Sequence, residues 1–419
     1  MKRSGRADSS AEPSGGFQPP IICLAALVAL ASACGRPAPA SPAPARAPGD
    51  GFAALRAYLD REVEAGAFPG GVVVVGHQSR AVLTYAFGHY GEDDPRPVTD
   101  STVYDLASLT KVVGLTTATM LLAAHDSLDL EAPVGRFLPE YRDDPRAGVR
   151  VRHLLLHDAG LPAWRPLYRE ANDAAGALAL ALATPLDTPP GVRYTYSDLG
   201  AIALTAVVES RLGEPIDGVL ARVVFAPLGM HDTRFLPPKS WRDRIAPTER
   251  DPWRGRVLRG EVHDENAARL GGVSGHAGLF STGPDLARFA FWLLDAWHGR
   301  ARTGPAVPWT VVRLFTHRYG EPPGSSRTLG WDTPSEGSSA GHCLAPGSFG
   351  HTGFTGTSLW IDPARELVVI LLTNRLHPTR ENHAIRRVRP AVADLAVAAA
   401  RGSAACPTAS RVDTASGPS

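Results

Sequence analysis

A serine and a lysine three positions apart are the residues of this chain whose types and spacing could perform chemistry. Ser108 and Lys111 lie in the segment DLASLTKVVGLTTATMLLAA. Residues three apart lie on one face of a helix, so the lysine amine can reach the serine hydroxyl. A lysine whose pKa is lowered by burial can take the serine proton and leave a nucleophilic oxygen. The spacing therefore predicts a Ser-x-x-Lys pair for acyl transfer.

Lysine is scarce in the sequence, which draws attention to Lys111. The 43 lysine and arginine residues include only three lysines, Lys2, Lys111 and Lys239. A lysine retained where arginine is otherwise used indicates a role that needs loss of a proton, because a guanidinium keeps its proton in proteins. The alternative is structural. Ser108 would cap the helix and Lys111 would be a solvated residue of its first turn, although the helix dipole disfavours a cation there.

Two further segments carry polar residues next to glycines. Residues 194–200 are YTYSDLG and precede a helical pattern, and residues 350–356 are GHTGFTG and precede a strand pattern. Tyr196 either offers a phenol that exchanges a proton or is a core aromatic residue whose hydroxyl reaches the surface. His351 is equally a polar residue at a strand edge, and Gly353 a turn glycine.

Short strands near both ends of the chain must position these residues. Apolar runs at 71–76 and 81–87, and again at 357–362 and 367–373, are joined by four residues, so each pair predicts a hairpin. Helical periodicity occurs at 52–66, 109–124, 173–184, 198–212, 215–224, 284–297 and 380–400. This order predicts one sheet closed by both chain ends, with helices over one face and a second, helical lobe. A site is expected in the cleft between the lobes.

In their order and spacing, three segments resemble the motifs of the serine β-lactamase and penicillin-binding-protein superfamily. They are SLTK at 108–111, YSD at 196–198 and HTG at 351–353. The chain is most similar to the class-C-like branch, which includes esterases, D-aminopeptidases and low-molecular-weight penicillin-binding proteins. Supporting stretches at 153–161, 262–266 and 275–281 extend the similarity over about residues 51–400.

The resemblance implies a mixed α/β fold of the β-lactamase/transpeptidase type. In that fold an antiparallel sheet formed by both chain ends is flanked by helices, and a helical lobe lies beside it. The resemblance also implies that Ser108 is the nucleophile and that Lys111 assists its deprotonation. Tyr196 would exchange the proton with Ser108 and the leaving group. No cofactor and no metal are implied.

The same resemblance assigns substrate-binding positions. His351, Thr352 and Gly353 would lie on a strand edge facing the nucleophile, and the backbone N–H groups of Ser108 and Phe354 would form the oxyanion hole. Two fixed donors aimed at the developing oxyanion suit acyl transfer. His157, His263 and His276 show no metal-ligand spacing, and we expect them to be structural hydrogen-bonding residues.

Two positions depart from the β-lactamase pattern. Asp198 replaces an Asn of many relatives, and an ionised Asp beside Lys111 would favour the charged lysine and move the role of base toward Tyr196. His351 replaces a Lys that lies near the substrate carboxylate in many β-lactamases. Histidine is mostly neutral at pH 7 and titrates nearby. We therefore expect weak anchoring of an anionic β-lactam and a pH-sensitive rate.

The predicted function is an exported serine hydrolase that acts through an acyl-enzyme on Ser108, either a carboxylesterase or a D-amino-acid-specific peptidase. The alternatives are a β-lactamase and a slow-turnover penicillin-binding sensor. The partner would be a small ester, peptide or β-lactam substrate. With 43 basic and 42 acidic residues, a formal net charge of +1 and no basic block, the composition disfavours nucleic acid as a partner.

The N-terminal region predicts export. Residues 1–33 resemble a signal peptide, with an apolar run at 21–31 that is too short to span a bilayer comfortably. Cleavage after residues 31–33 would release a soluble secreted protein. Alternatively Cys34 is the lipidated residue of a lipoprotein, which would attach the protein to a membrane in the periplasm or cell envelope. Residues 34–50 predict a Pro/Ala-rich spacer, 51–400 the hydrolase domain and 401–419 a disordered tail.

Overall fold

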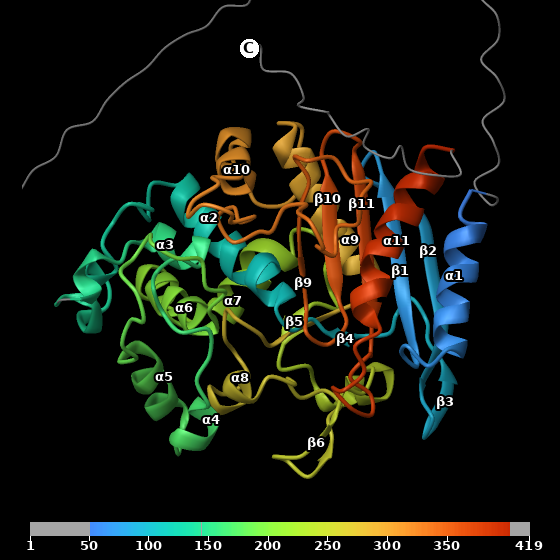
Figure 1. Ribbon diagram of the computed structural model, residues 1–419, viewed down its shortest axis with the longest axis horizontal. Helices are drawn as coiled ribbons and strands as arrows, with labels where there is room; N and C mark the ends of the chain where they lie inside the picture. The colour runs from blue at the N-terminus through green and yellow to red at the C-terminus, as the bar shows by residue number, and fades with distance from the viewer. Residues whose placement is uncertain (1–50, 144, 403–419) are drawn as a thin grey trace, which may run out of the picture. The chain divides into compact units, whose positions relative to one another are not determined.

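A six-stranded antiparallel sheet organises the protein, and both ends of the folded chain contribute to it (Figure 1). The computed structural model describes residues 51–143 and 145–402. The strands follow the order β3-β2-β1-β11-β10-β9 across the sheet. Their bounds are β1 Gly70–His77, β2 Arg80–Gly91, β3 Asp94–Pro97, β9 Phe349–Thr352, β10 Ser358–Asp362 and β11 Leu367–Thr373.

Helices fill most of the chain between these strands and form a lobe beside the sheet (Figure 1). The helices on the sheet are α1 (Ala53–Glu64), α9 (Gly283–Trp297) and α11 (Ile385–Ala400). The others are α2 (Thr117–Ala124), α3 (Val151–Leu156), α4 (Leu167–Glu170), α5 (Ala174–Leu182), α6 (Asp198–Leu212), α7 (Ile216–Leu220), α8 (Glu265–Arg269) and α10 (Trp309–Thr316).

Shorter elements connect the sheet to the helical lobe. A three-stranded sheet joins β4 (Tyr104–Asp105), β8 (Leu279–Ser281) and β5 (Arg234–Phe235), and a small hairpin joins β6 (Arg250–Asp251) to β7 (Arg256–Val257). Short 3-10 turns occur at η2 (Val134–Arg136), η3 (Pro139–Tyr141), η4 (Arg146–Gly148) and η6 (Lys239–Arg244).

Each half of the main sheet contains a hairpin that the sequence predicts. β1 and β2 are joined by Gln78 and Ser79, whose φ angles of 52° and 56° suit a two-residue turn. β10 and β11 are joined by residues 363–366. β1 also pairs with β11, from Gly71 opposite Thr373 to the far end of both strands. The first and last long strands therefore meet in the sheet, which confirms that both chain ends close it.

Both faces of the sheet are buried, which explains the uninterrupted valine run of β1. Val73 and Val75 belong to a core shared with α1 and α11, whereas Val72 and Val74 belong to a core that includes α9. Successive side chains of a strand point to opposite faces, so a strand covered on both sides is apolar throughout. Helices therefore cover both faces, and the expectation that they cover one face is wrong.

The helix expected at 109–124 begins as a π-helix. Residues Lys111–Thr116 form this segment (η1), and α2 continues from it. Thr117 Oγ1 donates to the carbonyl oxygen of Val112, five residues earlier, at 2.9 Å. Short π-helical segments are rare in proteins as a whole, but those that occur are often at functional sites. This one starts three residues after Ser108. A second π-helical segment, Ala221–Phe225 (η5), takes over the end of the helix expected at 215–224.

The last helix starts at Ile385, later than the predicted residue 380. The guanidinium of Arg375 donates to the carbonyl oxygens of Arg380 and Asn382, at 3.2 and 2.9 Å. The segment between β11 and α11 is thus fixed in a non-helical form.

Several expectations concern residues outside the described ranges. These are the signal peptide at 1–33, lipidation of Cys34, the spacer at 34–50 and the tail over residues 403–419. They stay predictions. Within the described part of the chain, no helix combines the length and the hydrophobicity that a bilayer crossing requires.

Candidate active site

Ser108 lies on a sharp turn between β4 and η1. The preceding residue, Ala107, has a φ of 45°, which non-glycine residues seldom adopt. Its N–H donates to Oδ1 of buried Asp105 at 2.8 Å, and this bond holds the turn. Backbone strain of this kind persists where the surrounding structure enforces it, and it is typical of functional sites. Ser108 is partly exposed at the wall of a cavity.

The Lys111 side chain is buried, and its ammonium has three acceptors. Nζ lies 3.1 Å from Ser108 Oγ, 2.9 Å from the carbonyl oxygen of His276 and 2.7 Å from Asp198 Oδ1. An ammonium has three N–H donors, and these three oxygen atoms lie close enough to neutralise and solvate it. The residue is only 3% exposed, so water does not compete for these donors.

Lys111 keeps its positive charge and is not a neutral amine that could act as a base. Burial by itself lowers the pKa of Lys111, but the carboxylate of Asp198 and the hydroxyl of Tyr196 outweigh it and raise the pKa above its ordinary value of 10.5. The lowered pKa that a lysine base would require is therefore not supported. The alternative, that Asp198 keeps the lysine charged, agrees with the ion pair. A charged Lys111 donates a hydrogen bond to Ser108 and has no lone pair to accept its proton.

Tyr196, the residue predicted to exchange a proton with Ser108, lies beside Lys111. It lines the same cavity, and its buried hydroxyl has no hydrogen-bond partner within the described residues. Nζ of Lys111 and Cζ of Arg327 lie 5.0 and 5.2 Å from the centroid of its ring. Both distances are within the range of cation–π attraction.

Two neutral histidines flank Tyr196. The ring centroids of His157 and His351 lie 4.6 and 5.8 Å from that of Tyr196. Burial, helped by the positive charges of Arg327 and Lys111, holds the pKa of both imidazoles well below 6.5. The prediction of a neutral His351 is supported. The pH-sensitive rate expected from its titration near neutrality is not, because burial among cations moves that titration well into the acid range.

A backbone group fixes the tautomer of each histidine. Nδ1 of His157 accepts the N–H of Ser197 at 3.1 Å, so its proton lies on Nε2. Nδ1 of His351 lies 2.8 Å from the carbonyl oxygen of Thr352, which only accepts, so Nδ1 carries the proton. Nε2 of His351 is consequently a buried acceptor, and it has no partner among the residues described.

The backbone amides of Ser108 and Phe354 are both unpaired. Neither N–H donates to an acceptor within residues 51–143 and 145–402, and both residues line the cavity. Thr352 and Gly353 line it as well, at the end of edge strand β9. The structure thus brings together the predicted nucleophile, lysine, tyrosine and both candidate oxyanion donors.

Threonine hydroxyls fasten the turn after β9 to the segment that carries the serine. Thr355 Oγ1 donates to the carbonyl oxygen of Asp105 at 2.7 Å, and Thr357 Oγ1 to that of Leu106 at 3.0 Å. These four residues are buried. The hydrogen bonds hold the two amide donors in one fixed relation, although 246 positions separate Ser108 from Phe354 in sequence.

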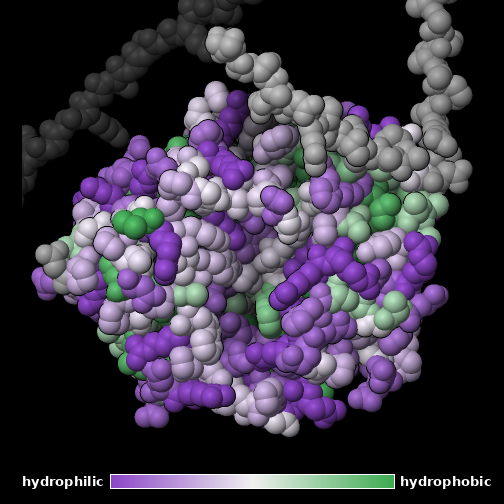
Figure 2. Space-filling view, viewed as in Figure 1, coloured by the Kyte–Doolittle hydropathy of each residue, from purple (hydrophilic) through white to green (hydrophobic). Residues whose placement is uncertain are grey.

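A cavity of about 370 Å³ contains these groups and is rich in arginine. No carboxylate is part of its lining. The face shown in Figure 2 is mainly hydrophilic, with hydrophobic residues in small separate groups. The lining residues are Ser108, Tyr194, Tyr196, Arg327, His351, Thr352, Gly353, Phe354, Arg375, His383, Ile385, Arg386 and Arg389.

The four arginines were not predicted from the sequence. Burial lowers the pKa of Arg375 to about 10, and burial together with neighbouring Arg375 lowers that of Arg389 to about 9, so both are cations at pH 7. Arg386 and Arg389 lie on α11, whereas Arg327 and Arg375 come from two other segments. In an arginine-rich chain, no local pattern marks them as members of one site. Weak anchoring of anions does not follow from a neutral His351, because these arginines supply the positive charge.

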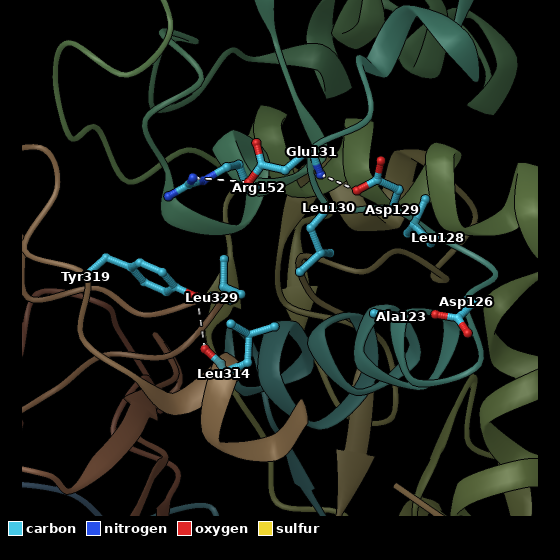
Figure 3. A pocket seen from close by; sticks show the side chains of 10 residues that line it. All are labelled: Ala123, Asp126, Leu128, Asp129, Leu130, Glu131, Arg152, Leu314, Tyr319 and Leu329. Carbon is cyan, nitrogen blue, oxygen red and sulfur yellow. Dashed lines mark hydrogen bonds and ion pairs between the residues drawn. The ribbon is translucent and has the colours of Figure 1, made fainter. Parts of the chain in front are cut away.

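A larger cavity of about 520 Å³ lies elsewhere, between α10 and the segment that follows α2 (Figure 3). Its wall combines leucines with the carboxylates of Asp126, Asp129 and Glu131, and Arg152 pairs with Glu131 at 3.1 Å. No serine, cysteine or histidine lines it. Size therefore does not identify the site, whereas the chemistry around Ser108 does. Within the described residues, no cluster of ligating side chains could hold a metal ion.

Replacing Asp198 with Asn should lower the pKa of Lys111. In the natural protein the pKa is raised, so the ammonium persists as pH rises past 10.5. Without the carboxylate, burial dominates and the pKa falls below 10.5. We expect ¹³C NMR of ε-labelled lysine to show this, since the chain has only three lysines and Lys239 provides an exposed reference. Equal titration of Lys111 in both proteins would contradict the ion-pair argument.

Replacing Gly353 with Ala should displace the Phe354 amide. A Cβ at Gly353 would lie 2.1 Å from Thr357 Oγ1 and 2.3 Å from the carbonyl oxygen of Leu106, so the turn must move. Loss of one oxyanion donor lowers kcat by about 10²–10³-fold. Gly347 is the matched control, because a Cβ there meets nothing within 4 Å. Unchanged ester hydrolysis in Gly353→Ala would exclude this amide from the site.

Comparison with known proteins agrees with the motifs. Residues 55–393 match the family model for Beta-lactamase. The chain is 31% identical to the N-acetylmuramyl-L-alanine amidase of Bacillus subtilis (strain 168), over 76% of this chain and 80% of that protein. It is 30% identical to a protein of Salmonella agona (strain SL483) named as a candidate D-alanyl-D-alanine carboxypeptidase, over 77% and 82%.

Solved structures share the fold at lower identity. A penicillin-binding protein homologue from Caulobacter crescentus aligns with a TM-score of 0.66 and 20% identity, over 84% of this chain and 98% of that one. EstCE1, a hydrolase with promiscuous acyltransferase activity, aligns with a TM-score of 0.64 and 22% identity, over 81% and 97%. These likenesses confirm the predicted β-lactamase/transpeptidase-like fold. The chain thus belongs to the β-lactamase family, within the superfamily of serine β-lactamases and penicillin-binding proteins.

Proposed function

We propose that this protein hydrolyses an amide or ester through an acyl-enzyme on Ser108, and that its substrate is a peptidoglycan-derived peptide with a free carboxylate. The observation that carries the proposal is the set of contacts at Lys111. Its ammonium donates to Ser108 Oγ at 3.1 Å while Tyr196, beside it, has an unpartnered hydroxyl. This arrangement leaves the serine proton free to pass to Tyr196.

Acylation follows from these positions. Tyr196, as its phenolate, accepts the Ser108 proton while Oγ attacks the substrate carbonyl carbon. The carbonyl oxygen becomes an oxyanion and accepts hydrogen bonds from the N–H groups of Ser108 and Phe354. When the tetrahedral intermediate collapses, the bond to the leaving nitrogen or oxygen breaks and Tyr196 returns its proton to that atom. Lys111 stays charged throughout and stabilises the alkoxide and phenolate oxygens.

Deacylation repeats the sequence with water. Tyr196 takes a proton from a water molecule, whose oxygen attacks the acyl carbon, and the same two amides hold the second oxyanion. Collapse breaks the ester bond to Ser108, and Tyr196 returns the proton to Oγ. Every proton that leaves one atom is thus received by another within the site, with no cofactor in any step.

The charge of the cavity supports an anionic substrate. Arg327 is 9% exposed and has Tyr194 as a hydrogen-bond partner through Nε, at 3.0 Å. Its Nη1 is buried and unpartnered within the described residues. A carboxylate would satisfy this donor in a charge-assisted hydrogen bond. The names of the Bacillus and Salmonella relatives, an amidase and a carboxypeptidase, point to peptidoglycan amides as the bonds cleaved.

Export is part of the proposal. A protein that acts on cell-wall peptides meets them outside the cytoplasm, and the signal-peptide pattern at 1–33 with Cys34 as a lipidation candidate fits that location. Mass spectrometry of the mature protein isolated from its host tests this. A diacylglycerol adduct at Cys34 would support a tethered form. A mature protein that still begins at residue 1 would contradict export.

The proposed reaction is tested by comparing the turnover of defined substrates by the natural protein and by a variant that lacks the Ser108 hydroxyl. We expect the protein to hydrolyse p-nitrophenyl acetate and to release alanine from N-acetylmuramyl-L-alanine or an acyl-D-alanyl-D-alanine peptide. Ser108→Ala should lose at least about 10³-fold in kcat/KM. Ser335→Ala, at an exposed serine outside the cavity, is the control.

The outcomes separate the remaining functions. A stable mass increase on Ser108 without turnover would favour a slow penicillin-binding sensor. Hydrolysis of benzylpenicillin near the diffusional range, with no peptide cleavage, would favour a β-lactamase. Hydrolysis that persists in Ser108→Ala would contradict the proposed acyl-enzyme.

Replacing Arg327 with Met should change substrate preference. Loss of the cation beside Tyr196 should lower the rate on every substrate. A substrate with a carboxylate should also lose the charge-assisted hydrogen bond to Arg327. We therefore expect the ratio of kcat/KM for the peptide to that for p-nitrophenyl acetate to fall by about tenfold or more. Arg327→Lys should recover part of the ratio. An unchanged ratio in Arg327→Met would place the anion elsewhere.

A further inference from the structure

Three consecutive carbonyl groups, beginning at the last residue of β9, each accept a hydrogen bond from a side chain. The carbonyl oxygen of Thr352 lies 2.8 Å from His351 Nδ1. That of Gly353 accepts from Arg389 Nη2 at 2.5 Å, and that of Phe354 accepts from Arg375 Nε at 2.9 Å. The peptide groups next to the cavity are therefore held through their oxygens by an imidazole and two guanidinium groups.

Arg389 is the guanidinium group of this set that donates to the Gly353 carbonyl. It lies on α11, and its Nη2 also donates to the carbonyl oxygen of Thr357 at 2.8 Å. Within the described residues no carboxylate forms an ion pair with it, and its Nε is buried without a partner. Burial and nearby Arg375 disfavour its charge, but the guanidinium is still cationic at pH 7. The same turn is also held by a neutral donor, the hydroxyl of Thr355. A neutral side chain would therefore be enough to hold the turn in place, and the positive charge of Arg389 needs another explanation.

The Gly353 carbonyl and the Phe354 N–H belong to one planar peptide group. In a trans peptide the two bonds point in opposite directions, so a donor on the oxygen leaves the N–H directed away from it. A cation that donates to the oxygen draws electron density from the nitrogen and makes the N–H a stronger donor, since linked hydrogen bonds polarise one another. The Phe354 N–H is one of the two candidate oxyanion donors.

We propose that Arg389 is a positioning residue that polarises the Gly353–Phe354 peptide group and so strengthens the Phe354 N–H as an oxyanion donor. The inference rests on the proposed function, because it assigns Arg389 to the same site. Arg375 holds the next carbonyl and keeps the following peptide in register. The cation acts on the developing negative charge through the peptide group and does not need to touch the substrate.

A spectroscopic measurement tests the polarisation without turnover. In the full-length protein labelled with ¹⁵N-phenylalanine, Phe354 is one of 13 phenylalanines, and Phe354→Leu assigns its signal. We expect Arg389→Met to move the Phe354 amide proton upfield, as a weaker donor, and Arg389→Lys to move it less. Arg387→Met is the matched control, because Arg387 lies on the same helix and pairs with Glu62, away from the cavity lining.

A kinetic measurement tests the consequence for the reaction. p-Nitrophenyl acetate carries no anion for an arginine to bind, so a loss on it reports on the transition state. One oxyanion donor contributes about 10²–10³-fold, so weakening it should cost about tenfold in kcat/KM in Arg389→Met, with partial rescue in Arg389→Lys. The Ki of a neutral alkylboronic acid, whose adduct with Ser108 carries an anionic oxygen, should rise by the same factor.

The outcomes distinguish the inference from the proposed function. A Phe354 amide shift that is the same in Arg389→Met and Arg387→Met overturns the inference, whatever the rates. An upfield shift with parallel losses in kcat/KM and boronate affinity supports it. If the unmodified protein neither hydrolyses esters nor binds the boronate, the proposed function fails, and the amide shift alone still decides whether Arg389 polarises this peptide group.

Discussion

The structure of the site depends on one buried ammonium group. Lys111 has three N–H donors and three acceptors, and each acceptor comes from a different part of the chain. Ser108 precedes the π-helix, Asp198 begins α6, and the carbonyl of His276 lies in the loop before β8. A buried cation with a missing partner is costly, so these three segments are constrained to meet at one point. The nucleophile is positioned by the same requirement.

The acceptors of the Lys111 ammonium are themselves held in place by further residues. His276 presents its carbonyl to Lys111 because its ring is held on both sides, with Nε2 2.9 Å from Asp264 Oδ1 and Nδ1 2.7 Å from Ser274 Oγ. Asp264 also caps α8 by accepting the N–H of Ala267 at 2.7 Å. The histidines of this region thus act as hydrogen-bonding supports, as their sequence spacing suggested, and one carboxylate fixes both a helix start and the loop that faces the lysine.

The elements of the fold were more predictable from the sequence than the electrostatics of the site. The hairpins follow from short apolar runs joined by short polar turns, and the serine and lysine are three residues apart, so both patterns are visible in a short window. The charge of Lys111 depends on a carboxylate 87 positions away, at Asp198. The burial of His351 depends on how β9 packs against the lobe. Arg327 and Arg389 meet the site from two distant segments, and no local pattern marks them.

The cations around Tyr196 explain why two histidines next to it are kept neutral. Lys111 and Arg327 already lie within about 5 Å of its ring, inside the range of cation–π attraction. Protonated His157 or His351 would add like charge at the same place, and burial makes that addition more costly. Both imidazoles therefore contribute shape and fixed hydrogen bonds without changing charge near neutral pH. With the lysine, the arginine and both histidines each held in one protonation state, the positive charge beside Tyr196 comes from Lys111 and Arg327 and stays constant near neutral pH.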